Sequence, residues 1–270
     1  DGRSGHPKNG EWQMSFYHGI LTDYRPDAFC DSAAVDSSHQ HDCMWARRTL
    51  GFVKGAGAPA YMWTLDDINK ANDWAEFWWQ LQTSPENTIA IKDSSATITG
   101  WRKGNHLDVH FILPGADWYP KPHILKLDQD IATPSAYKYI GDQAATAPAG
   151  FQRPSDMLHH CVWQRPRLLA KVAGYNGRFL SLCLPRRKGA RPAVVTPLPA
   201  GIGALALRIE FGAVTDTLVT AFDHRLLDAG DISGRGKWCV VRQSAKTGKV
   251  LDCALGHGTY LRYAGKFIHI

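Results

Sequence analysis

The stretch Leu107-Asp-Val-His-Phe-Ile-Leu-Pro-Gly115 shows the pattern that decides the fold of this chain. Apolar side chains occupy every second position from Leu107 to Leu113, and the polar Asp108 and His110 lie between them. Successive side chains of a strand point to opposite faces of a sheet, so a period of two predicts a β-strand with one buried face. Pro114-Gly115 then ends the strand.

The same period of two recurs through most of the chain. It is found in segments 12–18, 205–211, 238–241, 250–253, 260–263 and 267–270. Tyr175-Asn176-Gly177 predicts a hairpin turn because Asn-Gly tolerates a positive φ, and Lys103-Gly104-Asn105 predicts another. Short strands separated by turn signals predict an all-β chain, a multi-sheet antiparallel β-sandwich with few helices.

One segment fits two patterns. Ile68, Ala71, Ala75 and Trp78-Trp79 could line one face of a helix, but residues 74, 76, 78 and 80 could equally alternate on a strand. We favour a strand because β-rich stretches flank the segment. For the whole chain we expect an N-terminal β portion at 1–116, a Pro- and Ala-rich crossing loop at 117–153 and a C-terminal β portion at 154–270.

Composition and charge narrow the class of partner. The chain has 270 residues, a net charge of +6 and a sequence pI near 9.0, which suits an anionic polysaccharide, a nucleic acid or a membrane surface. Ten Trp, ten Phe and nine Tyr suit both strands and the stacking of sugars. The densest basic cluster is Arg186, Arg187, Lys188 and Arg191, which could also be an ordinary solvated loop.

Nucleic acids and membranes fit the sequence less well than polysaccharides. No zinc finger, RNP-like motif or basic recognition helix accompanies the basic residues, and no stretch approaches the ~18 apolar residues of a membrane span. We therefore expect neither as the partner. The chain begins at Asp1 rather than at Met, which predicts a mature or cleaved product.

The six cysteines, an even number, form no CxxC pair. Cys239 and Cys253 are equally distant from the turn around Thr247-Gly248, so opposed strands could join them in a disulfide. Disulfides would imply a secreted or periplasmic location, whereas buried free thiols are the alternative.

Polar residues that could do chemistry are concentrated in the first 42 residues. They comprise His6, His18, Asp23, Asp27, Asp31, Asp36, His39, His41 and Asp42. Imidazole and carboxylate together suit a zinc site, although loop polars and caps would show the same composition. Asp66-Asp67 could be an acid/base pair, but neighbouring strand residues face opposite sides, so we favour ion pairs or caps.

The order of several segments resembles the C-terminal β-sandwich domain of heparinase II/III-like polysaccharide lyases. The resemblance rests on Gly5-His6, Gly10–Asp23, Ser38–His41, Arg47–Lys54, Tyr61–Ile68, Trp74–Thr83 and Arg178–Pro185. It implies a β-sandwich beside an α-helical toroid and β-elimination on heparin, heparan sulfate or alginate. The toroid, which carries a catalytic Tyr in those lyases, is absent from these 270 residues.

The resemblance also implies site residues. It places a structural zinc on His6, Asp23 and His39, with His41 as the other option for the third ligand, and a catalytic imidazole on His6 under another register. Arg47 and Arg48 could meet substrate carboxylate or sulfate, or could be strand-edge charges.

The sequence also departs from the family pattern. Ser4 and Lys8 stand where the family's HxHxDxG run has its first His and its Asp. These departures favour the alternative of a non-catalytic carbohydrate-binding or structural module derived from such a lyase.

Overall fold

The computed structural model describes residues 20–38, 43–70, 74–84, 86–112, 126–132, 165–222 and 226–268, and within them every regular element is a β-strand. The strand expected from Leu107 is confirmed as β8 (His106–Ile112), with Val109 and Phe111 buried. The ambiguous segment forms β5 (Ala75–Gln82), in which Phe77 and Trp79 are buried and Trp78 is exposed. The strand prediction was therefore correct there.

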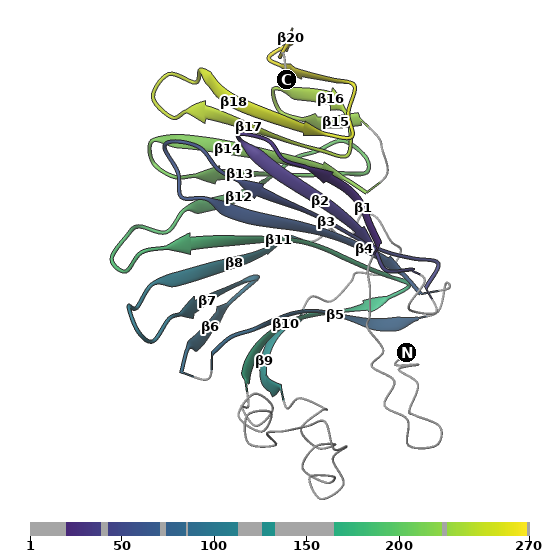
Figure 1. The fold of residues 1–270 in the computed structure, drawn as a ribbon. Coiled ribbons are helices and arrows are strands. Elements are labelled where there is room, and N and C mark those ends of the chain that lie inside the picture. Colours follow the sequence, from purple (N-terminus) through teal and green to yellow (C-terminus); the bar gives the residue numbers. More distant parts are fainter. Residues whose placement is uncertain are drawn as a thin grey trace, which may run out of the picture.

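Sheet A is the central sheet of the molecule (Figure 1). It has eight strands in the order β1-β2-β3-β4-β11-β8-β7-β6, and neighbours pair antiparallel. Its other strands are β1 (Ile20–Arg25), β2 (Cys30–Asp36), β3 (Trp45–Val53), β4 (Tyr61–Asn69), β6 (Thr88–Lys92), β7 (Ser95–Thr99) and β11 (Asn176–Arg186). β11 thus inserts a late segment between two early ones.

Three smaller sheets complete the architecture. Sheet B has the order β5-β10-β9, with β10 (Arg165–Gly174) and β9 (Lys126–Ala132), so a strand lies within the range expected as a crossing loop. Sheet C contains β12 (Val194–Leu198), β13 (Ala204–Glu210), β14 (Val214–Ala221), β17 (Trp238–Ser244) and β18 (Val250–Gly256) in that order. Sheet D contains β15 (Leu226–Ala229), β16 (Ile232–Arg235), β19 (Tyr260–Tyr263) and β20 (Lys266–Phe267).

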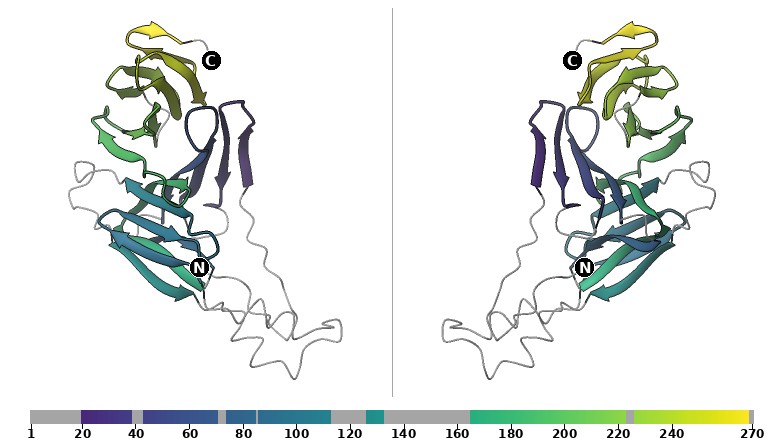
Figure 2. Two further views of the ribbon diagram at one scale, coloured as in Figure 1. Left: turned by 90° about the vertical axis from the view of Figure 1, so that its left-hand side faces the viewer. Right: turned by 90° about the vertical axis from the view of Figure 1, so that its right-hand side faces the viewer.

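The sheets stack as layers in the order B, A, C, D. One apolar cluster joins sheet B to sheet A through Phe77, Trp79 and Phe179, and a second joins sheet A to sheet C through Trp63 and Trp238. A third cluster lies between sheets C and D. Figure 2 shows strands β1–β3, in purple, standing across from the green to yellow strands of sheet C. The expected fold class, a multi-sheet antiparallel β-sandwich, is confirmed.

The expected hairpin at Asn176-Gly177 is wrong. Both residues lie inside β11, paired with Asn69 and Ile68 of β4, and neither has a positive φ. The chain instead passes from sheet B to sheet A between β10 and β11. Gly177 is needed for packing, because a Cβ there would lie 2.3 Å from the Phe77 ring. The other expected turn is confirmed: Gly104 has a φ of +63° between β7 and β8.

Of the two alternatives for the cysteines, the disulfide between Cys239 and Cys253 does not form, and Cys239 follows the other, a buried thiol. Cys239 is a free, fully buried thiol that pairs with Leu255, whereas Cys253 pairs with Val241. The two strands do form the expected hairpin, but their register leaves the cysteines diagonal rather than opposite.

Candidate functional site

A row of alternating charges crosses four neighbouring strands of sheet A on the face toward sheet C. Asp36 of β2 is opposite Arg47 of β3, which is opposite Asp67 of β4, which is opposite Arg178 of β11. Arg47 Nε lies 3.2 Å from Asp36 Oδ2, and Arg178 Nε lies 2.8 Å from Asp67 Oδ1. Cross-strand neighbours of opposite charge support the pairing of the strands.

Two turns from sheets C and D add a lysine and a histidine to this row. Lys237 lies between β16 and β17, and His257 directly follows β18; the Lys237 amide donates to the Gly256 carbonyl at 2.9 Å. His257 Nε2 lies 2.9 Å from Asp23 Oδ2 of β1. The charged rim, as we call this cluster, consists of Asp23, Asp36, Arg47, Asp67, Arg178, Lys237 and His257.

His257 adopts an unusual backbone conformation. Its φ is +49°, in the left-handed region that non-glycine residues other than Asn, Asp and His seldom occupy. Such conformations cost on the order of 1–3 kcal/mol and are concentrated at functional sites. The strained turn holds the imidazole against Asp23 with a quarter of its side chain exposed (27%).

The rim also shifts the proton affinity of its members. Burial lowers the pKa of Lys237, the positive charge of Arg47 lowers it further, and Asp67, Asp23 and Asp36 partly offset both effects. At Asp36, burial acts to raise the pKa, but hydrogen bonds from Ser38 and Arg47 outweigh it and the pKa is lowered. The rim therefore combines an amine that releases its proton more readily than usual with a carboxylate that stays ionised.

The structure separates the residues that sequence analysis grouped together. Asp23 and Arg47 both belong to the rim. Arg48 lies on the opposite face of sheet A, where its Nε donates to Asp66 Oδ1 at 2.6 Å. His6, His39 and His41 lie outside the described residues. In the described ranges no group of three His, Cys, Asp or Glu is arranged to hold a metal ion.

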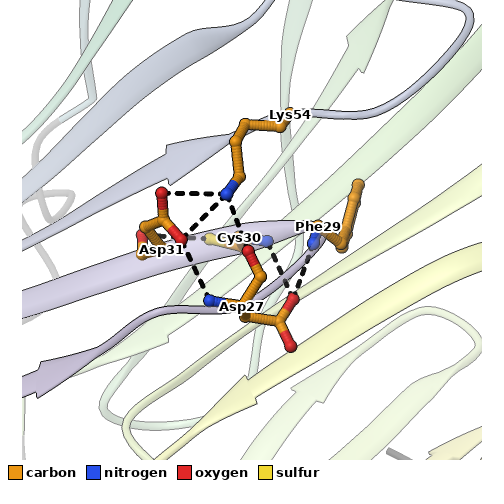
Figure 3. Close-up of polar contacts among 5 residues, drawn as sticks. All are labelled: Asp27, Phe29, Cys30, Asp31 and Lys54. Atoms are coloured by element: carbon orange, nitrogen blue, oxygen red, sulfur yellow. Dashed lines mark hydrogen bonds and ion pairs between the residues drawn. The ribbon is translucent and has the colours of Figure 1, made fainter.

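Two other acids of the N-terminal cluster hold a turn. Asp27 Oδ1 accepts hydrogen bonds from the amides of Phe29 and Cys30, and Asp31 Oδ1 accepts one from the Asp27 amide (Figure 3). Lys54 Nζ donates to the Asp27 carbonyl at 2.7 Å and to both oxygens of Asp31 at 2.9 Å. Both acids therefore cap the turn before β2, Asp27 from within the turn and Asp31 from the start of the strand.

Asp66 and Asp67 resolve into ion pairs on opposite faces of β4. Asp66 meets Arg48, and Asp67 meets Arg178. The preference for ion pairs over an acid/base pair is confirmed.

Sequence reasoning missed His257, Lys237 and Arg178. Each lies near a strand end far along the chain from Asp23. Arg178 joins the rim because β11 pairs with β4 inside sheet A, whereas Lys237 and His257 join it because sheet C stacks against sheet A. The signal that could have been noticed is a lone His between Gly256 and Gly258, where a turn follows an alternating strand.

The fold and the rim define a layered antiparallel β-sandwich with a charged cluster where sheets A and C meet. No protein-family model matches the chain, and no curated protein matches its sequence. Among solved structures it is similar to a heparinase III with methylated lysines, at 13% identity and a TM-score of 0.47. The match covers 76% of this chain but 27% of that structure, so the chain spans about a quarter of its length.

In the part of the chain that the structure describes, no helix has the length and apolar character needed to cross a membrane.

Proposed function

We propose that this chain is the β-sandwich part of a lyase that acts on an acidic polysaccharide by β-elimination, with the charged rim as its working surface. The supporting observation is the pair His257–Asp23, an imidazole held by a carboxylate at 2.9 Å beside Arg47 and Lys237. The reaction class, β-elimination, comes from the sequence resemblance to heparinase II/III-like lyases, and the rim contains side chains that suit this reaction.

The chemistry assigns one task to each kind of group. A base takes the proton α to the uronate carboxylate, the C–O bond to the leaving sugar breaks as the C=C bond forms, and an acid protonates the leaving oxygen. Lys237 with its lowered pKa suits the proton acceptor, and His257, oriented by Asp23, suits the donor. Arg47, with more than half of its side chain exposed, would neutralise the carboxylate.

A helical toroid, as a further domain or a companion chain, is part of this proposal and would supply the opposite wall of the site. His6 is proposed either as a catalytic imidazole or as a zinc ligand, and Arg48, on the opposite face of sheet A from the rim, as a substrate contact outside the rim. Export to the periplasm or the medium is proposed with them.

A structural zinc on His6, Asp23 and His39 is likewise proposed. Asp23 offers a carboxylate with one-fifth of its side chain exposed; its oxygens lie 3.3 and 3.1 Å from Arg25 Nε and one lies 2.9 Å from His257 Nε2, so a zinc ion there would have to displace Arg25. The ion would tie the segment before β1 to the β2–β3 connection. Elemental analysis and thermal unfolding with and without a chelator test it; absence of zinc together with unchanged unfolding would remove it.

A non-catalytic glycan-binding module is the second candidate. Both rim arginines already pair within the chain, Arg47 with Asp36 and Arg178 with Asp67, which suits a structural role as well as substrate binding. In that case the chain would bind acidic polysaccharide without cleaving it.

The ultraviolet absorbance of newly formed unsaturated uronate decides between the two. The assay uses the isolated chain, and the chain with any helical companion encoded beside it, on heparan-type and alginate-type polymers. His257→Asn and Lys237→Met should each abolish product formation, whereas Lys246→Met, at an exposed turn, should not. Binding without product in both preparations would refute the lyase and leave the binding module.

A further inference from the structure

The basic cluster found in the sequence lies on one of two turns at the end of sheet A opposite the charged rim, and none of its residues belongs to the rim. The turn before β8 contains Trp101, Arg102 and Lys103, and the turn after β11 contains Arg187 and Lys188. The Lys188 amide donates to Asn105 Oδ1 at 3.2 Å, so the two turns lie side by side. A Cβ on Gly104 would lie 3.1 Å from Lys188 Cδ, which shows how closely the lysine stem packs.

These turns form a basic surface with one large aromatic ring. We call it the basic tip, and it consists of Trp101, Arg102, Lys103, Arg187, Lys188 and Arg191, all of them exposed. Trp101 is 54% exposed, and the Arg102 guanidinium lies 4.8 Å from the centroid of its ring.

Two acids, Asp108 and Glu86, interact with arginines at or beside the tip. Asp108 is paired with Arg186, whose Nε lies 2.7 Å from Asp108 Oδ2. Arg186 is not one of the tip residues, so this carboxylate neutralises a cation outside the tip. The pKa of Glu86 is lowered, mainly by a hydrogen bond from Ser84 and to a smaller extent by the positive charge of Arg102. The tip therefore gathers five exposed cations, a charge complementary to an anionic polymer.

The basic tip and the charged rim are separate places. β11 begins near the rim at Arg178 and ends at the tip at Arg186, and in Figure 1 its arrowhead points to the left edge of the molecule. At about 3.3 Å per strand residue, these two arginines lie roughly 26 Å apart. A short substrate at the rim would not reach the tip, but a long polymer would.

We propose that the basic tip is a second binding site for acidic polysaccharide, one that retains long chains while the rim handles a local segment. The ligand class rests on the proposed function, whereas the site itself rests on the tip's own geometry. Guanidinium groups bind planar carboxylate and sulfate groups, and an exposed indole offers a flat face for a pyranose ring. Two sites on one polymer raise its overall affinity without any new contact at the rim.

The test compares two triple variants that remove equal charge. The tip variant is Lys103→Ser/Arg187→Ser/Lys188→Ser, and the control is Lys246→Ser/Lys249→Ser/Lys266→Ser, at exposed positions on sheets C and D. Affinity for a long sulfated uronate polymer should fall about tenfold or more in the tip variant and stay within about twofold in the control. Equal losses in both would show a general effect of net charge and overturn the proposal.

Further measurements separate this inference from the proposed lyase activity. The tip variant should turn over short oligosaccharides like the wild type, and Trp101→Ala should weaken the binding of long polymer without changing its dependence on salt. If no elimination is found but the tip variant still loses binding, the second site stands without the lyase. Double-stranded DNA bound as tightly as the uronate polymer at equal ionic strength, and lost equally in the tip variant, would identify a nucleic-acid surface and overturn the glycan assignment.

Discussion

Arg242 and Asp216 face each other on strands β17 and β14 as a bidentate ion pair that is almost completely buried. Nε to Oδ1 and Nη2 to Oδ2 are both 2.7 Å, and the two side chains are 2% and 0% exposed. Tyr61 of sheet A donates to the same carboxylate at 2.9 Å, and Arg242 Nη1 donates to the Lys54 carbonyl at 2.7 Å. The pair therefore links sheet C to sheet A and fixes the β3–β4 connection.

Breaking this pair should destabilise the whole sandwich. Arg242→Met leaves the buried Asp216 carboxylate without its counter-charge, although Tyr61 still donates to it. The variant also removes a donor to the Lys54 carbonyl, and the expected cost is about 3–5 kcal/mol in the free energy of unfolding. Removing both charges, in Asp216→Leu/Arg242→Met, should cost less than Arg242→Met alone. Urea unfolding measures all three proteins; a cost below about 1 kcal/mol for the single variant would show that the ion pair does not hold the layers together.

The glycine in β11 should be intolerant of even one added methyl group. Gly177→Ala places a Cβ against the buried Phe77 ring, and overpacking of this kind costs about 1–3 kcal/mol. Gly100→Ala is the matched control, because its Cβ would meet an ordinary contact at 3.4 Å. Thermal unfolding that leaves both variants equal to the wild type would contradict the packing of sheet B on sheet A.

Gly177 shows which features of the fold the sequence could reveal and which it could not. The strand β8 was predictable because apolar and polar side chains alternate along it, and that pattern is local, whereas β5 was assigned only from the β-rich stretches that flank it. Asn176-Gly177 looked like a turn because its dipeptide is a strong local signal. The Phe77 ring that makes glycine necessary there comes from another sheet, so no window of neighbouring residues contains the reason.

The residues of the candidate site could not be grouped from local sequence patterns either, because they come from different strands and sheets. Asp23 was singled out as a zinc ligand and Arg47 as a substrate contact, and sequence analysis did not predict that both lie in one charged cluster or that Arg48, next to Arg47, points to the other face. His257 lies near the opposite end of the chain from Asp23, and their contact depends on the order in which the sheets stack. Strand order in sheet A, where β11 separates β4 from β8, cannot be obtained from periodicity.

Stability should fall in mild acid because of His110. Burial lowers the pKa of this imidazole, and Asp108 only partly offsets the effect. Its other cross-strand neighbours on that face, Ser95 and Leu182, carry no charge. Because the folded pKa lies below the unfolded value of about 6.5, the unfolded chain binds the proton first, and stability is lost as the pH falls below about 6.5.

His110→Gln should remove this part of the pH dependence while leaving the protein folded at neutral pH. Unfolding midpoints measured above and below about pH 6.5 give the slope for both proteins. A His110 pKa above its ordinary value in an NMR titration would contradict the stated burial.

The buried thiols should be unreactive until the protein unfolds. Burial raises the pKa of Cys30 and of Cys239 to about 12 and that of Cys183 to about 11, so each stays a protonated thiol near neutral pH. Alkylation followed by peptide mass spectrometry should find these three unmodified in native protein and fully modified in denatured protein. Rapid labelling of Cys239 in the native state would show that the interface between sheets C and D opens.

The central claim is that this sandwich recognises the acidic groups of a polysaccharide, and calorimetric titration with matched polymers tests it most directly. One polymer is a sulfated uronate chain, and the other is the same chain after carboxyl reduction and desulfation. We expect saturable binding of the acidic polymer, weakened by salt, and an affinity for the neutral polymer that is at least about tenfold lower. Equal affinity for both polymers, or no binding to either, would contradict it.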